Sequence, residues 1–253
     1  TSTVPTLSSS SPADGATGVG VNDNIVLTFS EAVVTDAGNI LISTGSNSDG
    51  GFESIPVGNA KVSISSKVVT INPAGTFASS TTYNVQVPST AFDDAAGNSY
   101  AGITNATALN FTSADVIAPT MTITATDGSS AVSDGATTND ATLTVTFTSS
   151  EATTNFVVGD ITVSGGALSN FTNTDTSSNT TYTATFTPSA NGATTIDVAA
   201  NGFTDAAGNN NTAASQFNWT YDNTAPTMTI TATDGSNAAS DGATTNDATL
   251  TVT

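Results

Sequence analysis

The residues of this chain best suited to chemistry are carboxylates and amides that recur in two short motifs. The segment Asp94-Ala-Ala-Gly-Asn98 returns as Asp205-Ala-Ala-Gly-Asn209. Upstream of each motif lies a Ser-Glu-Ala segment, which carries Glu31 in the first case and Glu151 in the second. Carboxylate and amide oxygens are the ligands that Ca²⁺ prefers, and the ion takes about six to eight of them. Two equivalent groups of Ca²⁺ ligands are therefore one interpretation of these motifs.

The same motifs are also good turn sequences. Asp and Asn side chains accept or donate hydrogen bonds to the local backbone, and Gly supplies a positive φ. For any single Asp this interpretation is the stronger one. The repetition of the whole group in two different parts of the chain favours a metal site instead. The spacing does not match an EF-hand or a nonapeptide calcium repeat.

Composition excludes several classes of function. The chain has no Cys and no His, so disulfides, zinc–thiolate sites and His-based acid–base catalysis are absent. Two basic residues against 21 acidic ones give a net charge of −19, which repels nucleic acids and anionic lipid. No apolar run is long enough for membrane insertion, and we recognise no signal peptide. A pair of carboxylates could hydrolyse glycosides only in a pocket, and these acids fall in turns, so we expect no enzyme and no catalytic residues.

Short apolar–polar alternations predict the elements that must position the acids. Such runs recur every ten to fifteen residues or so between Gly, Asn, Asp and Ser clusters, and no segment has a helical period. About seven strands per hundred residues are typical of an antiparallel sandwich. The clearest runs are Ile25–Phe29, Val68–Ile71, Tyr83–Val87, Leu143–Phe147, Tyr182–Phe186 and Phe217–Tyr221.

A repeat divides the chain into units. Residues 118–146 return as residues 225–253 with two differences, Ser130/Asn237 and Val132/Ala239. A short X-Pro-Thr phrase opens each unit at Pro5, Pro119 and Pro226. We therefore expect domains at 1–115 and 116–222, with 223–253 as the first part of a further copy, in a window of a longer tandem array. Short linkers predict an extended rod.

This arrangement predicts where the acidic motifs lie. In a seven-stranded sandwich, the loops after the second and sixth strands share the pole where the chain enters. The linker acid Asp115 should then lie near Glu151, Asp205 and Asn209, and Asp222 should take the same place before the third unit. We expect the facing end of the preceding domain to contribute Asp14 and Asp23 at one junction and Asp127, Asp134 and Asp140 at the next. The predicted Ca²⁺ ligands are Glu31, Asp94, Asn98, Asp115, Glu151, Asp205, Asn209 and Asp222.

Several segments resemble known bacterial repeats. In residues 1–115, Ser11–Val19, Asn24–Glu31, Tyr83-Asn-Val85 and Asp94–Asn98 resemble the SbsA-type immunoglobulin-like domain of S-layer and surface proteins. Gly159–Gly166, Tyr182–Pro188 and Phe203–Asn209 are similar to the bacterial immunoglobulin-like repeats of giant adhesins and biofilm proteins. The resemblance implies an all-β fold of tandem immunoglobulin-like sandwiches, located outside the cell or on its surface. The resemblance to calcium-dependent adhesin repeats also supports the predicted metal sites.

Three functions fit these features. The first is a Ca²⁺-stiffened spacer that holds an adhesive tip away from the cell, with neighbouring repeats as its contacts. The second is a self-assembling subunit of an extracellular filament, sheath or S-layer, whose partners are copies of itself or other surface proteins. The third and weakest is a polysaccharide-binding module. It would need an exposed aromatic platform such as Trp219 and Tyr221, but one member of an alternating aromatic pair usually packs in the core. A further alternative is an isopeptide bond between Lys61 or Lys67 and an Asn side chain. The interpretation of both residues as ordinary surface lysines is stronger.

Overall fold

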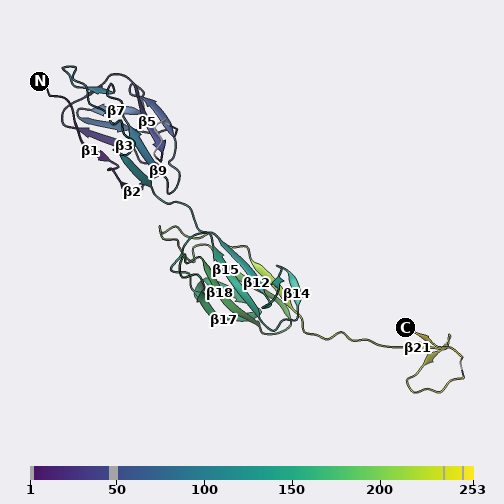
Figure 1. The fold of residues 1–253 in the computed structure, drawn as a ribbon. Helices are drawn as coiled ribbons and strands as arrows, with labels where there is room; N and C mark the ends of the chain where they lie inside the picture. Colours follow the sequence, from purple (N-terminus) through teal and green to yellow (C-terminus); the bar gives the residue numbers. More distant parts are fainter. Residues whose placement is uncertain (1–2, 46–50, 236, 247) are drawn as a thin grey trace.

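The computed structural model describes residues 3–45, 51–235, 237–246 and 248–253. Two β-sheet bodies follow one another along an elongated molecule, and an extended stretch leads from the second to a small third sheet at the C-terminus (Figure 1). The expected tandem all-β sandwiches are confirmed. The only helical element among the described residues is the 3₁₀ turn η1 (Val158–Asp160), and none of these residues forms a helix with the length and hydropathy of a membrane span.

The first body is a sandwich with a small additional ribbon. Its two main sheets have the strand orders β1-β3-β8-β7 and β2-β11-β9-β5-β6, and β10 pairs with β4 beside them. The strands are β1 (Leu7–Ser11), β2 (Ala16–Val19), β3 (Ile25–Phe29), β4 (Val34–Thr35), β5 (Asn39–Thr44), β6 (Glu53–Pro56), β7 (Val62–Ser65), β8 (Val68–Ile71), β9 (Thr82–Gln86), β10 (Phe92–Asp93) and β11 (Asn110–Ser113).

The second body has the same plan. Its sheets run β13-β12-β15-β18-β17 and β14-β20-β19-β16. The strands are β12 (Met121–Thr126), β13 (Ala131–Val132), β14 (Ala136–Thr138), β15 (Leu143–Ser149), β16 (Ile161–Ser164), β17 (Gly166–Asn173), β18 (Thr181–Pro188), β19 (Gly192–Val198) and β20 (Phe217–Tyr221). The third sheet has the strands β21 (Ala232–Thr233), β22 (Ala238–Ala239) and β23 (Thr251–Val252).

One strand pair in each body departs from the antiparallel expectation. β2 runs parallel to β11, and β14 runs parallel to β20. In both bodies the first part of the chain lies in one sheet and then crosses to the edge of the other. The crossing carries Asp14 or Asp134, whose carboxylate accepts hydrogen bonds from the backbone and side chain of Asn110 or Asn218. These two acids therefore fasten the crossover within their own domain.

Alternation along the strands explains why the sheets stack. In β12 and β15, every second side chain is buried and the residues between them are Thr, so each strand has one apolar face and one hydroxyl face. The buried faces pack around large aromatic side chains in each body, including Phe29 and Phe92 in the first and Phe186 and Trp219 in the second. Trp219 is 1% exposed, and its indole Nε1 donates to Thr138 Oγ1 at 3.0 Å. The core placement of Trp219 is therefore confirmed.

Separate cores predict separate unfolding. Replacing the fully buried Phe147 by Ala removes an aromatic ring that packs on Phe156, and we expect it to lower the free energy of unfolding of the second domain by about 3–5 kcal/mol. Trp219 is the only tryptophan in the chain, so its fluorescence during urea unfolding measures this domain. The matched change Phe29→Ala in the first core should leave the Trp219 midpoint unchanged. An equal shift from both variants would show that the two bodies unfold as one unit.

Candidate metal centre

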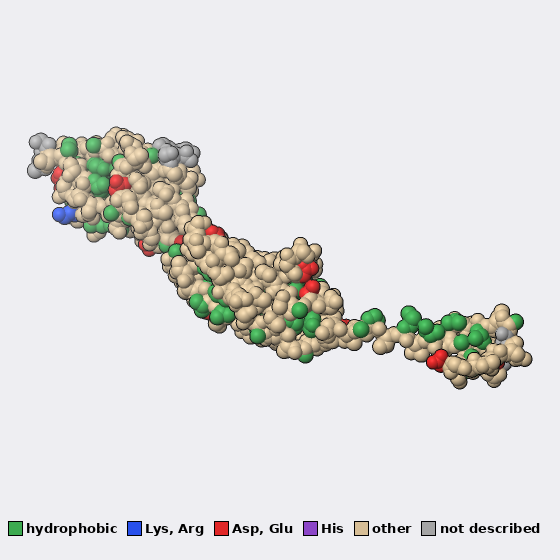
Figure 2. Space-filling model, turned by 60° about the horizontal axis from the view of Figure 1, so that its bottom comes forward, with side chains coloured by type: hydrophobic (Ala, Val, Ile, Leu, Met, Phe, Trp, Pro, Cys, Tyr) green, Lys and Arg blue, Asp and Glu red, His purple; other side chains and the backbone are tan. Residues whose placement is uncertain are grey.

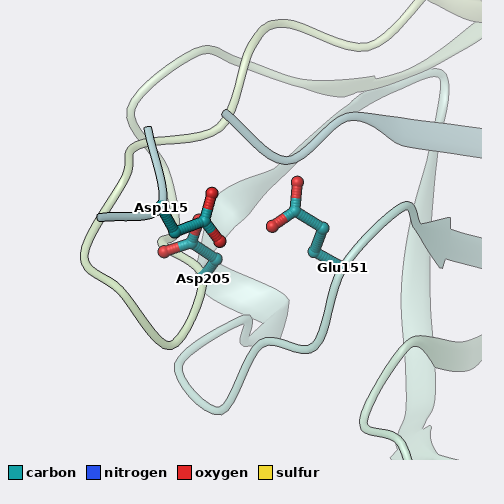
Figure 3. A group of neighbouring side chains, drawn as sticks. All are labelled: Asp115, Glu151 and Asp205. Atoms are coloured by element: carbon teal, nitrogen blue, oxygen red, sulfur yellow. The ribbon is translucent and has the colours of Figure 1, made fainter. Parts of the chain in front are cut away.

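Three carboxylates meet where the second domain begins. Asp115 lies in the linker, Glu151 follows β15, and Asp205 opens the turn that the Thr204–Asn210 bridge closes. One oxygen from each lies within 4.8 Å of the others, and Figure 3 shows Glu151 extending toward the Asp115 and Asp205 side chains. Of the described residues, these are the ones that form a group of three possible metal-ligating acids.

Asp205 is held in place by its own turn. The Asn209 backbone donates to Asp205 Oδ1 at 2.9 Å, and the Asn209 side chain donates to Oδ2 at 2.8 Å. Gly208 makes the turn possible because its φ is 93°. Asp205 is only 7% exposed. This burial raises the pKa of Asp205, but the hydrogen bonds from Asn209, Gly208 and Ala207 outweigh it, so the pKa lies below its ordinary value. Asp205 therefore stays ionised.

Asp115 connects the two domains. Its Oδ1 accepts hydrogen bonds from Ser79 Oγ of the first domain at 2.8 Å and from the Ile117 backbone at 3.1 Å. Its backbone carbonyl accepts one from Asn209 Nδ2 of the second domain at 3.3 Å. Ser79 also accepts from the Val116 backbone at 2.9 Å, so it fixes the linker twice. The sequence did not single out Ser79, because it lies in the Ser/Thr run 79–82 with no distinguishing neighbour.

Glu151 is the carboxylate of this group whose pKa is raised. Burial, followed by the negative charges of Asp115 and Asp205, raises the pKa of Glu151 above its ordinary value. Like charges at this distance repel, and a divalent cation placed among them would reverse that repulsion. The donor set consists of carboxylate oxygens with the Asn209 amide beside them, which suits Ca²⁺ by its chemistry.

The corresponding pole of the first domain is less complete. Asp94 and Asn98 form the same turn, with Asn98 donating from its backbone and its side chain at 2.8 and 2.7 Å. These bonds, led by that of the Asn98 side chain, lower the pKa of Asp94. Glu31 and Asp94 line one shallow pocket. Within the part of the chain that the structure describes, no third acid joins them, and the position equivalent to Asp115 is Thr1, outside that part.

Among the described residues, the remaining predicted acids form no further group of three. Asp222 Oδ1 accepts from the Thr224 backbone at 2.9 Å and from the Asn191 side chain at 3.4 Å. The acids expected at the facing ends of the domains join no described group of three. Asp23 and Asp127 accept from nearby backbone amides and Asp140 from the Thr138 hydroxyl, so turn chemistry explains them.

Comparison with known proteins gives the family. A family model described as "Bacterial Ig-like domain" matches residues 1–113, and a second model with the same description matches residues 115–221. The chain thus contains two bacterial Ig-like domains in tandem. No curated protein matches it.

Two solved structures match this chain at low sequence identity. InvD of Yersinia pseudotuberculosis is 18% identical, with 90% of this chain and 62% of that chain covered and a TM-score of 0.29. The S-layer protein rSbsC(31-844) is 14% identical, with 99% and 32% covered and a TM-score of 0.29. This chain thus spans less than two thirds of the length of either.

The crowding of carboxylates predicts that Glu151→Gln stabilises the metal-free protein. Above the raised pKa of Glu151, the wild type holds a third negative charge that Gln removes, so in chelator at neutral pH we expect the melting temperature of the second domain to rise by about 2–4 °C. The gain should disappear as the pH falls below about 4.5, the ordinary value for Glu, because Glu151 is then protonated in both the folded and unfolded states. Calorimetry over this range checks both statements. A variant less stable than wild type at neutral pH would contradict the repulsion.

Proposed function

We propose that these tandem bacterial Ig-like domains form a Ca²⁺-stiffened spacer within a large surface or secreted protein. One observation carries the proposal: the linker residue Asp115 is bonded to Ser79 of the first domain and grouped with Glu151 and Asp205 of the second. A cation held by these three carboxylates would be attached to both domains at once. It would fix the angle between them and keep the repeats in line.

Charge gives the cation its mechanical role. Without a cation, the three carboxylates repel one another at the point where the linker enters the second domain. Releasing Asp115 relieves that repulsion and loosens the linker at the same time. With the cation, the same carboxylates are attracted to one centre. A change in Ca²⁺ concentration would thus switch the junction between a loose and a stiff state.

The other features agree with a mechanical part placed outside the cell. The domains reach their folds without cysteine, and the chain is strongly acidic. We propose no catalytic activity for it. In this proposal the two domains contact mainly the neighbouring repeats of the same chain. Other parts of the protein would contact other surface proteins or glycans. Stacking of sugars on Trp219 is disfavoured because that ring is buried. Lys61 contacts the Glu53 carboxylate, which suits a surface ion pair better than an isopeptide bond.

The second candidate is a subunit of an extracellular filament, sheath or S-layer. It is favoured by the extended stretch before β21, where Met228 and Ile230 are largely exposed although the equivalent Met121 and Ile123 are buried. In the wild type, concentration-dependent assembly that persists in chelator would favour this candidate over the spacer.

The spacer predicts a metal-dependent gain in stability. At a Ca²⁺ concentration about a hundred times the dissociation constant, binding stabilises the folded second domain by about 2.7 kcal/mol, or roughly 10 °C in melting temperature. The gain should fall to near zero in Asp115→Asn and in Glu151→Gln. Glu31→Gln makes the same chemical change at the less complete pole of the first domain, so it should retain the full effect. Calorimetry with Ca²⁺, with Mg²⁺ and with chelator measures this, and an equal gain in all four proteins would contradict the proposed ligands.

A further inference from the structure

Nine threonines form a regular grid on one outer face of the second domain. They lie on β12, β15 and β18, whose six-residue ladders pair without a bulge. The residues between them point into the core and are buried. The three rows of the grid, each running across the three strands, are Thr122–Thr148–Thr181, Thr124–Thr146–Thr183 and Thr126–Thr144–Thr185. β17 extends two of the rows with Thr172 and Ser169.

The grid presents free hydroxyl and methyl groups and no charge. Among the described residues, the only side-chain hydrogen bond to a grid hydroxyl is the one that Thr185 accepts from Asn170 at 3.4 Å. None of the 21 acidic residues lies on β12, β15, β17 or β18. In a chain with a net charge of −19, an uncharged surface of this regularity requires an explanation.

Composition and strand preference do not supply that explanation. Thr is the polar residue that best suits a strand, so some Thr is expected on any solvated face. The outer face of the opposite sheet, however, mixes Asn218, Thr220, Ala193, Thr195 and Asp197. The first domain places Val26 and Val68 among Thr and Ser on its corresponding sheet. Of these three outer faces, the grid is the one with the same residue at every point.

A periodic surface suits a periodic partner. Strand geometry spaces the hydroxyls by about 4.8 Å between strands and about 6.6 Å along them. The spacing between strands is close to the shorter repeat of oxygen atoms on a prism face of hexagonal ice, and the spacing along the strands falls about a tenth short of the longer repeat. The hydroxyls can donate and accept as water does, and the methyl groups between them exclude disordered water. We propose that the threonine grid binds the surface of ice.

Sheet twist sets the expected strength. Neighbouring strands rotate by about 20–25°, so only the central part of one grid matches a crystal plane. Binding by one domain is therefore weak, and repetition along the chain adds to it. The third sheet begins the same pattern, because Thr233 pairs with Thr251, and Thr231 exchanges backbone hydrogen bonds with Thr253.

Partition into slowly grown ice tests the proposal with the full chain of residues 1–253. We expect the wild type to be incorporated into ice and to slow ice recrystallisation. Thr146→Lys places a charge at the centre of the grid and should reduce the ice-bound fraction by about tenfold. Thr124→Lys, at an exposed position in the same row, should do the same if Thr146→Lys folds poorly. The control is Thr195→Lys, which adds the same charge to the opposite face and should leave incorporation unchanged.

Three results would overturn the proposal. The first is exclusion of the wild type from ice, and the second is equal incorporation of the Thr146→Lys and Thr195→Lys variants. The third is self-association of the wild type in sedimentation that Thr146→Lys abolishes with no difference in ice, which would make a second copy the partner of this face.

Discussion

Repulsion among three carboxylates is the main physical constraint at the junction between the two domains. Asp115, Glu151 and Asp205 approach within 4.8 Å although each is negative when ionised. Hydrogen bonds within the protein hold two of them there: Asn209 donates to Asp205, and the Ser79 hydroxyl donates to Asp115. The site is thus preorganised at the expense of raising the pKa of Glu151. A cation bound among these carboxylates, as proposed, would relieve this repulsion.

The two sandwiches supply the rigidity that this device needs. Each has its own aromatic core, and the crossover acids Asp14 and Asp134 fix the parallel edge strands from inside each domain. Asp14 and Asp134 accept hydrogen bonds from groups of their own domain, whereas Asp115 accepts them from groups of both domains. Some acids of this chain thus stabilise the fold of one domain, while Asp115 lies among groups of both domains at the junction.

Periodicity predicted the fold well, because strands such as β3, β12 and β15 alternate and apolar residues at every second position have only one way to be buried. The group Asp115, Glu151 and Asp205 was predicted by combining motif positions with the topology of a sandwich. Other features depend on register and on partners far along the chain. The parallel pairing of β2 with β11 and the role of Ser79 are of this kind. So is the threonine grid, because its rows exist only once three strands are aligned. The turn hydrogen bonds of Asp23, Asp127 and Asp140 also depend on the folded chain. The sequence alone does not show which donor lies nearest to each carboxylate.

The most direct test of the account is the distance distribution between the two domains. The chain has no cysteine, so spin labels at Ser63→Cys on the first domain and Thr162→Cys on the second report on the junction alone. The account predicts a narrow distribution in Ca²⁺ that broadens in chelator, and a broad one under both conditions when Asp115→Asn is added. Distributions of equal width with and without Ca²⁺ in the wild type would contradict a metal-stiffened junction.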